Sequence, residues 1–168
     1  TLFGVSSFQL QFGSQRVYTP GDQLDALVVM NPAALKVHLA DLKPGGILIV
    51  NSDAFNQGNL TKVGYAASPL EDGSLSDFRV IPVELTRLTG NALTELSMTR
   101  VQVDRCKNFF ALGMMYWLYD RPMEGTIKWI ENKFKKNPIL VDANIKALHA
   151  GNAYAETAVI FGHHYKVK

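Results

Sequence analysis

Cysteine is almost absent from this chain: Cys106 is the only one among 168 residues. A single thiol excludes an internal disulfide framework, and it also excludes a cysteine-based metal cage or an iron–sulfur site held by this chain alone. Since no disulfide pattern points to an oxidising compartment, we expect a cytoplasmic protein.

Charge is scarce as well. The 17 basic and 15 acidic side chains leave a net charge of +2, and charged residues make up 19% of the chain, below the roughly 25% of typical soluble proteins. No stripe of Lys or Arg is visible, so we expect neither a nucleic acid nor a membrane as partner. Because hydrophobic residues reach 47%, we expect part of the surface to be covered by another subunit or domain.

Long apolar runs are missing too. The longest mostly apolar stretch, Phe109–Tyr119, is far shorter than the ~20 residues that cross a bilayer. No basic segment with a cleavage site marks a signal peptide. The chain starts at Thr1 without a methionine, and we expect it to be a segment of a longer polypeptide.

The first half of the chain reads as strands and turns. Alternating apolar and polar residues predict a half-buried strand, and continuous apolar runs predict strands covered on both faces. The expected strands are Val5–Phe12, a hairpin partner at Arg16–Thr19 after Gly13-Ser14-Gln15, Ala26–Met30, Ile47–Val50 and, with weaker patterns, Thr61–Ala66 and Phe78–Val83.

A capped helix is expected between two of these strands. Asn31 is a favoured N-cap and Pro32 a favoured first helical residue, so a helix should run from Pro32 to about Leu42. Lys43-Pro44-Gly45-Gly46 should stop it before the next strand. Strand, helix, turn and strand make one βαβ unit with parallel strands.

The second half reads as helices, because its apolar residues recur every three or four positions. The expected helices are Val83–Ser97, Val103–Tyr119, Glu124–Lys136 and Pro138 to about Phe161. The last of them carries small residues at Ala143, Ala147, Ala150 and Gly151, which permit close packing against a neighbour. The fold class is therefore α/β, a Rossmann-like sheet of mainly parallel strands followed by helices.

Nucleotide-binding motifs are absent. Neither G-x-G-x-x-G nor G-x-x-x-x-G-K-[ST] occurs, which disfavours a self-standing NAD or ATP enzyme. His38, His149 and the pair His163-His164 show no ligand spacing, so we expect no metal site. On the apolar face of its helix, Cys106 is expected to be a packed thiol.

Two further clusters have a structural and a functional interpretation. Lys133, Lys135 and Lys136 form either a solvated helix end, which we favour, or a phosphate contact. The aromatic residues Tyr116, Trp117 and Tyr119 fit packing or an interface better than a stacking platform.

Polar residues at the ends of strands and on helices are the best site candidates. Ligands of α/β sheets bind beyond the carboxyl ends of the strands, where Asn31 and Asn51-Ser52-Asp53 lie. For Asn31, a role as a helix cap is more plausible than a role in ligand binding. Ser6 and Ser7 could offer hydroxyls and N–H groups to a phosphate. Arg105, Lys107 and Asn108 provide two cations and an amide near the expected start of a helix. For these three residues, a structural role and a ligand-binding role are equally plausible.

Several segments, taken together, are similar to a known family. They are Val28–Ala34 (VVMNPAA), Leu42–Gly46 (LKPGG), the strand ending at Asn51, Arg105–Gly113 (RCKNFFALG), Tyr116–Pro122 (YWLYDRP) and Ala143–Thr157. Their order and spacing resemble the γ domain of 2-oxoacid:ferredoxin oxidoreductases, above all the form fused ahead of the thiamine-binding domain, as in the 2-oxoglutarate type. The likeness covers nearly the whole chain, so it implies one γ-type domain over residues 1–168, lacking the Gly-rich βα unit with which the family usually begins.

The resemblance implies a part of an enzyme, not an enzyme in itself. The complete family enzyme decarboxylates a 2-oxoacid on thiamine pyrophosphate with Mg²⁺, passes electrons through an iron–sulfur cluster to ferredoxin and transfers the acyl group to coenzyme A. The resemblance places those cofactors in partners, the thiamine-binding α domain and a cluster-bearing β subunit. This segment would then bind no cofactor alone, carry no catalytic residue, and serve assembly and the coenzyme A site.

The residues expected at the coenzyme A site are Lys107 and Asn108, followed by Ser6, Ser7 and Asn51. The alternative interpretation is a free-standing Rossmann-like module that binds a nucleotide or a small acid. A third is a scaffold without a ligand.

Overall fold

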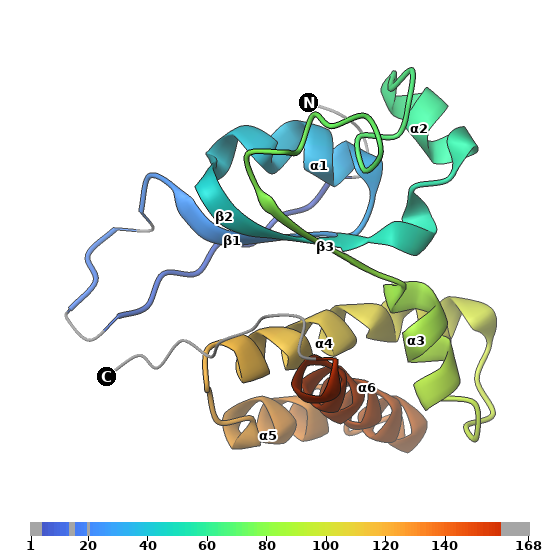
Figure 1. Ribbon diagram of the computed structural model, residues 1–168. Helices are drawn as coiled ribbons and strands as arrows, with labels where there is room; N and C mark the ends of the chain where they lie inside the picture. Colours follow the sequence, from blue (N-terminus) through green and yellow to red (C-terminus); the bar gives the residue numbers. More distant parts are fainter. Residues whose placement is uncertain (1–4, 14–15, 20, 159–168) are drawn as a thin grey trace. The chain divides into compact units, whose positions relative to one another are not determined.

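The computed structural model (Figure 1) describes residues 5–13, 16–19 and 21–158. The chain divides into two compact units, Thr1–Glu84 and Leu85–Lys168. We call the first the sheet unit and the second the helical unit. Among the described residues, all strands belong to the sheet unit, and the regular elements of the helical unit are helices.

The sheet unit is built on parallel strands. β1 (Leu24–Val29), β2 (Leu42–Asn51) and β3 (Arg79–Val83) form a sheet in the order β1-β2-β3, with Val29 opposite Val50 and Asn51 opposite Val83. The residues Ile47–Val50 of β2 are all buried, as the continuous apolar run predicts. The parallel α/β sheet and the strands expected at Ala26–Met30, Ile47–Val50 and Phe78–Val83 are thereby confirmed.

The βαβ unit is also confirmed. The Asn31 side-chain oxygen accepts a hydrogen bond from the Ala34 N–H at 2.9 Å and caps α1 (Pro32–His38), with Pro32 in the first turn. A 3₁₀ turn, η1 (Leu39–Asp41), continues it up to β2. The expected stop at Lys43–Gly46 was wrong, because these residues already belong to β2 and shape an irregularity in it. Gly45 has a φ of +75°, a conformation that glycine adopts without strain.

The strand expected at Thr61–Ala66 is wrong, since a helix lies there. α2 (Gln57–Val63) follows the 3₁₀ turn η2 (Ser52–Ala54). Its N-cap Asn56 accepts a hydrogen bond from the Asn59 N–H at 3.1 Å, and Gly64, at φ +80°, closes its last turn. Two good caps outweigh the β preference of Thr61 and Val63.

The strands expected at Val5–Phe12 and Arg16–Thr19 are also wrong: the described residues there have no regular structure, and Ser14 and Gln15 of the expected hairpin lie outside the described residues. Phe8 is 89% and Leu10 67% exposed. An alternating pattern becomes a strand only where a neighbour supplies ladder hydrogen bonds and apolar cover. In the described part of the chain, β1 pairs with β2 alone.

The helical unit holds α3 (Leu85–Ala92), α4 (Arg100–Leu118), α5 (Glu124–Lys133) and α6 (Pro138–Thr157). The four helices expected in this half are confirmed, but α3 ends at Ala92 and not at Ser97, and α5 ends at Lys133 and not at Lys136. The expected end of the last helix near Phe161 lies outside the described residues. α4 begins three residues earlier than expected, because Thr99 and Gln102 form a reciprocal capping box.

Close packing of α4 against α6 makes the core of the helical unit. The small residues Ala143, Ala147 and Gly151 of α6 are buried, together with Phe110, Gly113 and Met114 of α4. A side chain at Gly113 would collide with the α6 backbone near Leu148. The expectation that small residues permit a close approach is confirmed.

Candidate functional site

At the carboxyl edge of the sheet, Asn51 ties two strands together. It is the last residue of β2 and 0% exposed, and its side-chain N–H donates to the Met30 carbonyl oxygen, just after β1, at 3.3 Å. Asn31 next to it is occupied as the cap of α1. Asp53 is exposed and Ser52 partly buried. Asn31 and Asn51 therefore stabilise the fold at this edge, through the helix cap and the hydrogen bond between strand ends.

Lys107 and Asn108 lie on α4, in the helical unit. The Lys107 ammonium pairs with the Asp104 carboxylate at 2.7 Å, its side chain is 20% exposed, and Asn108 is exposed. We expected these residues near the start of the helix. Because α4 begins at Arg100, they lie about two turns inside it instead. The Lys107 ammonium is thus already paired with a carboxylate of its own helix.

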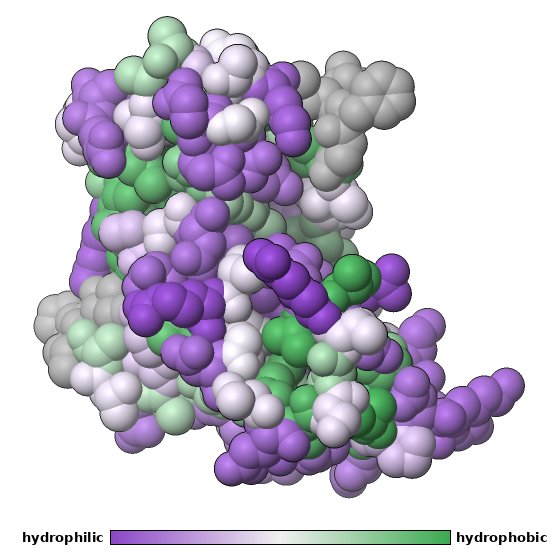
Figure 2. Space-filling model, turned by 90° about the vertical axis from the view of Figure 1, so that its right-hand side faces the viewer, coloured by the Kyte–Doolittle hydropathy of each residue, from purple (hydrophilic) through white to green (hydrophobic). Residues whose placement is uncertain are grey.

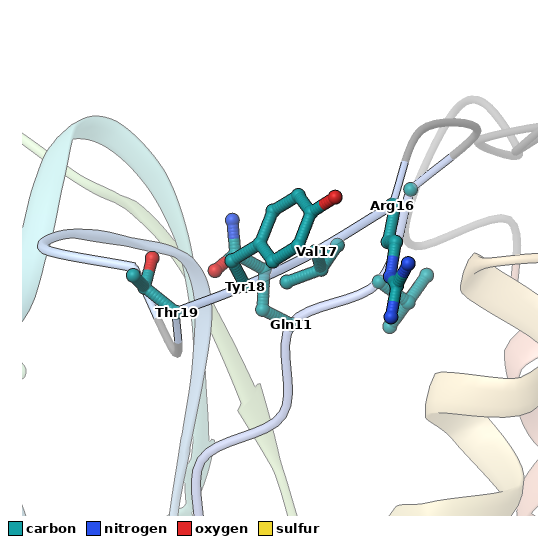
Figure 3. Close-up of a pocket in the computed structure, with 7 residues that line it drawn as sticks. Gln11, Arg16, Val17, Tyr18 and Thr19 are labelled. Atoms are coloured by element: carbon teal, nitrogen blue, oxygen red, sulfur yellow. The ribbon is translucent and has the colours of Figure 1, made fainter.

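Ser6 and Ser7 belong to the irregular N-terminal segment, where both are exposed. The structure places Lys107 and Asn108 on adjoining positions of one helix, whereas Ser6, Ser7 and Asn51 belong to the sheet unit. The same segment also forms a hollow, shown in Figure 3, that we did not expect from the sequence. The hollow is lined by Gln11, Phe12, Gly13, Arg16, Val17, Tyr18 and Thr19.

This hollow has few groups that could carry chemistry. The Arg16 guanidinium lies 5.3 Å from the centre of the Tyr18 ring, an attractive cation–π contact. Arg16 is the only charged residue among those that line the hollow. A binding site usually brings several polar groups together in a closed cavity, so the hollow supports no specific reaction.

The cysteine and the histidines were the remaining candidates for chemistry. Cys106 is buried, as expected, and burial raises the pKa of its thiol. His38 pairs with Asp41 at 3.1 Å and His149 is exposed, while His163 and His164 lie outside the described residues. Within the described ranges, no group of three or more His, Cys, Asp or Glu side chains could hold a metal ion. No helix in the same ranges is long and apolar enough to span a membrane.

Comparison with known proteins identifies the family. The family model of pyruvate ferredoxin/flavodoxin oxidoreductase matches residues 3–154. The chain belongs to this family. It is 47% identical over 167 residues to the 2-oxoglutarate oxidoreductase subunit KorA of Mycobacterium tuberculosis, a match that covers 99% of this chain and 26% of KorA. The chain thus spans about a quarter of that oxidoreductase subunit.

A solved structure of an oxidoreductase has the same fold. It is the 2-oxoglutarate:ferredoxin oxidoreductase from Magnetococcus marinus with 2-oxoglutarate, coenzyme A and succinyl-CoA bound. The match has a TM-score of 0.60 at 21% identity and covers 85% of this chain and 22% of that one. The arrangement of strands and helices described above therefore occurs within a larger oxidoreductase chain.

Proposed function

We propose that this chain is the γ domain of a thiamine-dependent 2-oxoacid:ferredoxin oxidoreductase that converts 2-oxoglutarate to succinyl-CoA and CO₂ and reduces ferredoxin. Its family membership supports the reaction class. The 47% identity to a 2-oxoglutarate oxidoreductase subunit is the observation that carries the choice of substrate. The sheet and helical units together would form this one domain, over residues 1–168, in a cytoplasmic enzyme.

Other parts of the enzyme would hold its cofactors. An iron–sulfur cluster needs several thiolates and this chain has one cysteine, whose thiol is buried and packed, so the residues present do not fit a cluster. We assign the cluster to a β subunit, and thiamine pyrophosphate with Mg²⁺ to an α domain. The γ domain would contribute to assembly and to the binding of coenzyme A.

Lys107 and Asn108 are the residues that we propose for coenzyme A. Both are polar, adjoining and accessible to solvent, and the Lys107 ammonium is a suitable partner for a phosphate. Ser6 and Ser7 are secondary candidates because they are exposed hydroxyls. Asn51 would act indirectly, by holding the ends of β1 and β2 in place.

Replacing Lys107 with Ala in the assembled enzyme tests the proposal. We expect the KM for coenzyme A to rise about tenfold, the effect of losing one charge-assisted hydrogen bond, while the KM for 2-oxoglutarate stays unchanged. Lys146→Ala is the matched control, because Lys146 forms a similar ion pair with Asp142 at 3.3 Å on α6. Equal KM values for coenzyme A in both variants would remove Lys107 from the site. A chain that purifies without enzyme partners and binds a nucleotide unrelated to coenzyme A would favour the free-standing binding module.

A further inference from the structure

Three aromatic rings form a cluster between α4 and α5. Phe109 lies 6.4 Å from both Trp129 and Phe134, and Trp129 lies 6.3 Å from Phe134, edge to face. Trp129 is nevertheless 53% exposed. On the face drawn in Figure 2, hydrophobic residues likewise reach the surface among hydrophilic ones. The two phenylalanines hold the indole in a fixed orientation while more than half of its surface remains accessible.

The charges of α5 are separated around Trp129. At about 100° per residue, Gly125 and Lys133 lie one turn before and one turn after Trp129 on the same face, and a Cβ on Gly125 would meet no atom within 4 Å. The acidic residues Glu124 and Glu131 lie roughly 140° to 160° away around the helix. The indole therefore has open space on one side, a cation on the other, and the acidic groups of its own helix far from it.

A second cation comes from α4. The hydroxyl groups of Tyr116 and Thr126 are hydrogen-bonded near the turn between the two helices, and Phe109 meets Trp129 farther along, so α4 and α5 run antiparallel. Arg105 is exposed and lies one turn before Phe109 on the same face of α4. This direction leads toward the Lys133 end of α5, so the exposed indole is bordered by Arg105 and Lys133.

Such a surface matches one part of coenzyme A. We propose that the adenine ring of coenzyme A stacks on Trp129 and that Arg105 and Lys133 bind the phosphates of its adenosine 3′,5′-bisphosphate portion. Aromatic side chains stack on bases, and guanidinium and ammonium groups recognise phosphate.

This inference rests on the proposed function and extends it. At about 100° per residue, Asn108 lies roughly 60° from Arg105 around α4, whereas Lys107 lies roughly 160° away, beyond its ion-pair partner Asp104. The nucleotide end of coenzyme A would lie at Trp129. The remainder would pass Asn108 first and reach Lys107 beyond the Asp104 carboxylate.

The chain has only two tryptophans, Trp117 and Trp129, so the Trp117→Phe variant makes Trp129 the sole fluorescent reporter. We expect adenosine 3′,5′-bisphosphate and coenzyme A to quench its emission with saturation. Pantetheine, which lacks the nucleotide, should leave the emission unchanged. Should Trp117→Phe fail to fold by circular dichroism, the Trp129→Phe chain gives the complementary reading, since the emission of Trp117 should not respond to either nucleotide.

Substitution tests the same contacts by calorimetry. Trp129→Ala, and separately the double variant Arg105→Ala/Lys133→Ala, should weaken the binding of coenzyme A about tenfold or more, with Lys146→Ala as the control. Coenzyme A that binds with unchanged affinity to both variants would overturn the role of Trp129 and leave the proposed function intact. Quenching of Trp129 combined with no effect of Lys107→Ala on the KM would support the platform and reject the Lys107 contact. A Trp129 emission that responds to neither nucleotide would overturn the inference.

Discussion

Gly151 of α6 lies directly against Phe110 of α4, with backbone touching backbone. A Cβ on Gly151 would overlap the Phe110 carbonyl oxygen and lie 2.7 Å from its carbon. The same crossing brings Gly113 so near that the Asn152 side chain donates a hydrogen bond to its carbonyl oxygen at 3.3 Å. The core of the helical unit (Figure 1) thus depends on two residues without side chains.

Gly151→Ala should therefore destabilise the chain by about 1–3 kcal/mol, because one added carbon must push the two backbones apart. Gly90→Ala in α3 is the matched control: its Cβ would meet nothing within 4 Å, and alanine is the better helix former, so stability should rise by up to about 1 kcal/mol. Thermal unfolding followed by circular dichroism measures both. An unchanged melting temperature for Gly151→Ala would contradict the close approach.

Asn51→Leu should destabilise the sheet unit by about 1–3 kcal/mol. The substitution removes a hydrogen bond from the Asn51 side chain, which is 0% exposed, to the Met30 carbonyl oxygen, which is partly buried. Urea unfolding measures the loss, and Asn91→Ala, at an exposed position of α3, should change stability by less than about 0.5 kcal/mol. If Asn51→Leu instead kept full stability and raised the KM for coenzyme A, Asn51 would be a direct contact.

Cys106 should react slowly with iodoacetamide in the native chain and quickly in guanidinium chloride. Burial raises the pKa of its thiol, and the thiolate is the reactive form. The raised pKa also makes the free energy of unfolding depend on pH. Above about pH 8.5, the usual pKa of a thiol, the thiol of the unfolded chain loses its proton while the buried thiol keeps it. The free energy of unfolding therefore falls as the pH rises. Cys106→Ala should remove that part of the alkaline loss, and a native alkylation rate equal to the denatured one would refute the packed thiol.

Much of the fold could be predicted from local signals. Asn31-Pro32 marks the start of α1 because a side-chain cap and a fixed proline φ act within a few residues. The periodicity of α4 and α6 likewise locates their buried faces. Lys107 and Asn108 could be chosen from their motif, whereas the ion pair of Lys107 with Asp104 became visible only in the structure.

By itself, the sequence determined the parallel βαβ unit, the four helices of the helical unit and the family, because caps, periodicity and the order of motifs are encoded in neighbouring residues. Only the tertiary structure decided that Val5–Phe12 is not a strand, since a ladder needs a partner that no local pattern supplies. It alone brought Phe109 to Trp129, 20 positions away in the chain. That contact depends on the turn after α4, which brings α5 back alongside it. An exposed tryptophan bordered by cations therefore arises only when the two helices pack together.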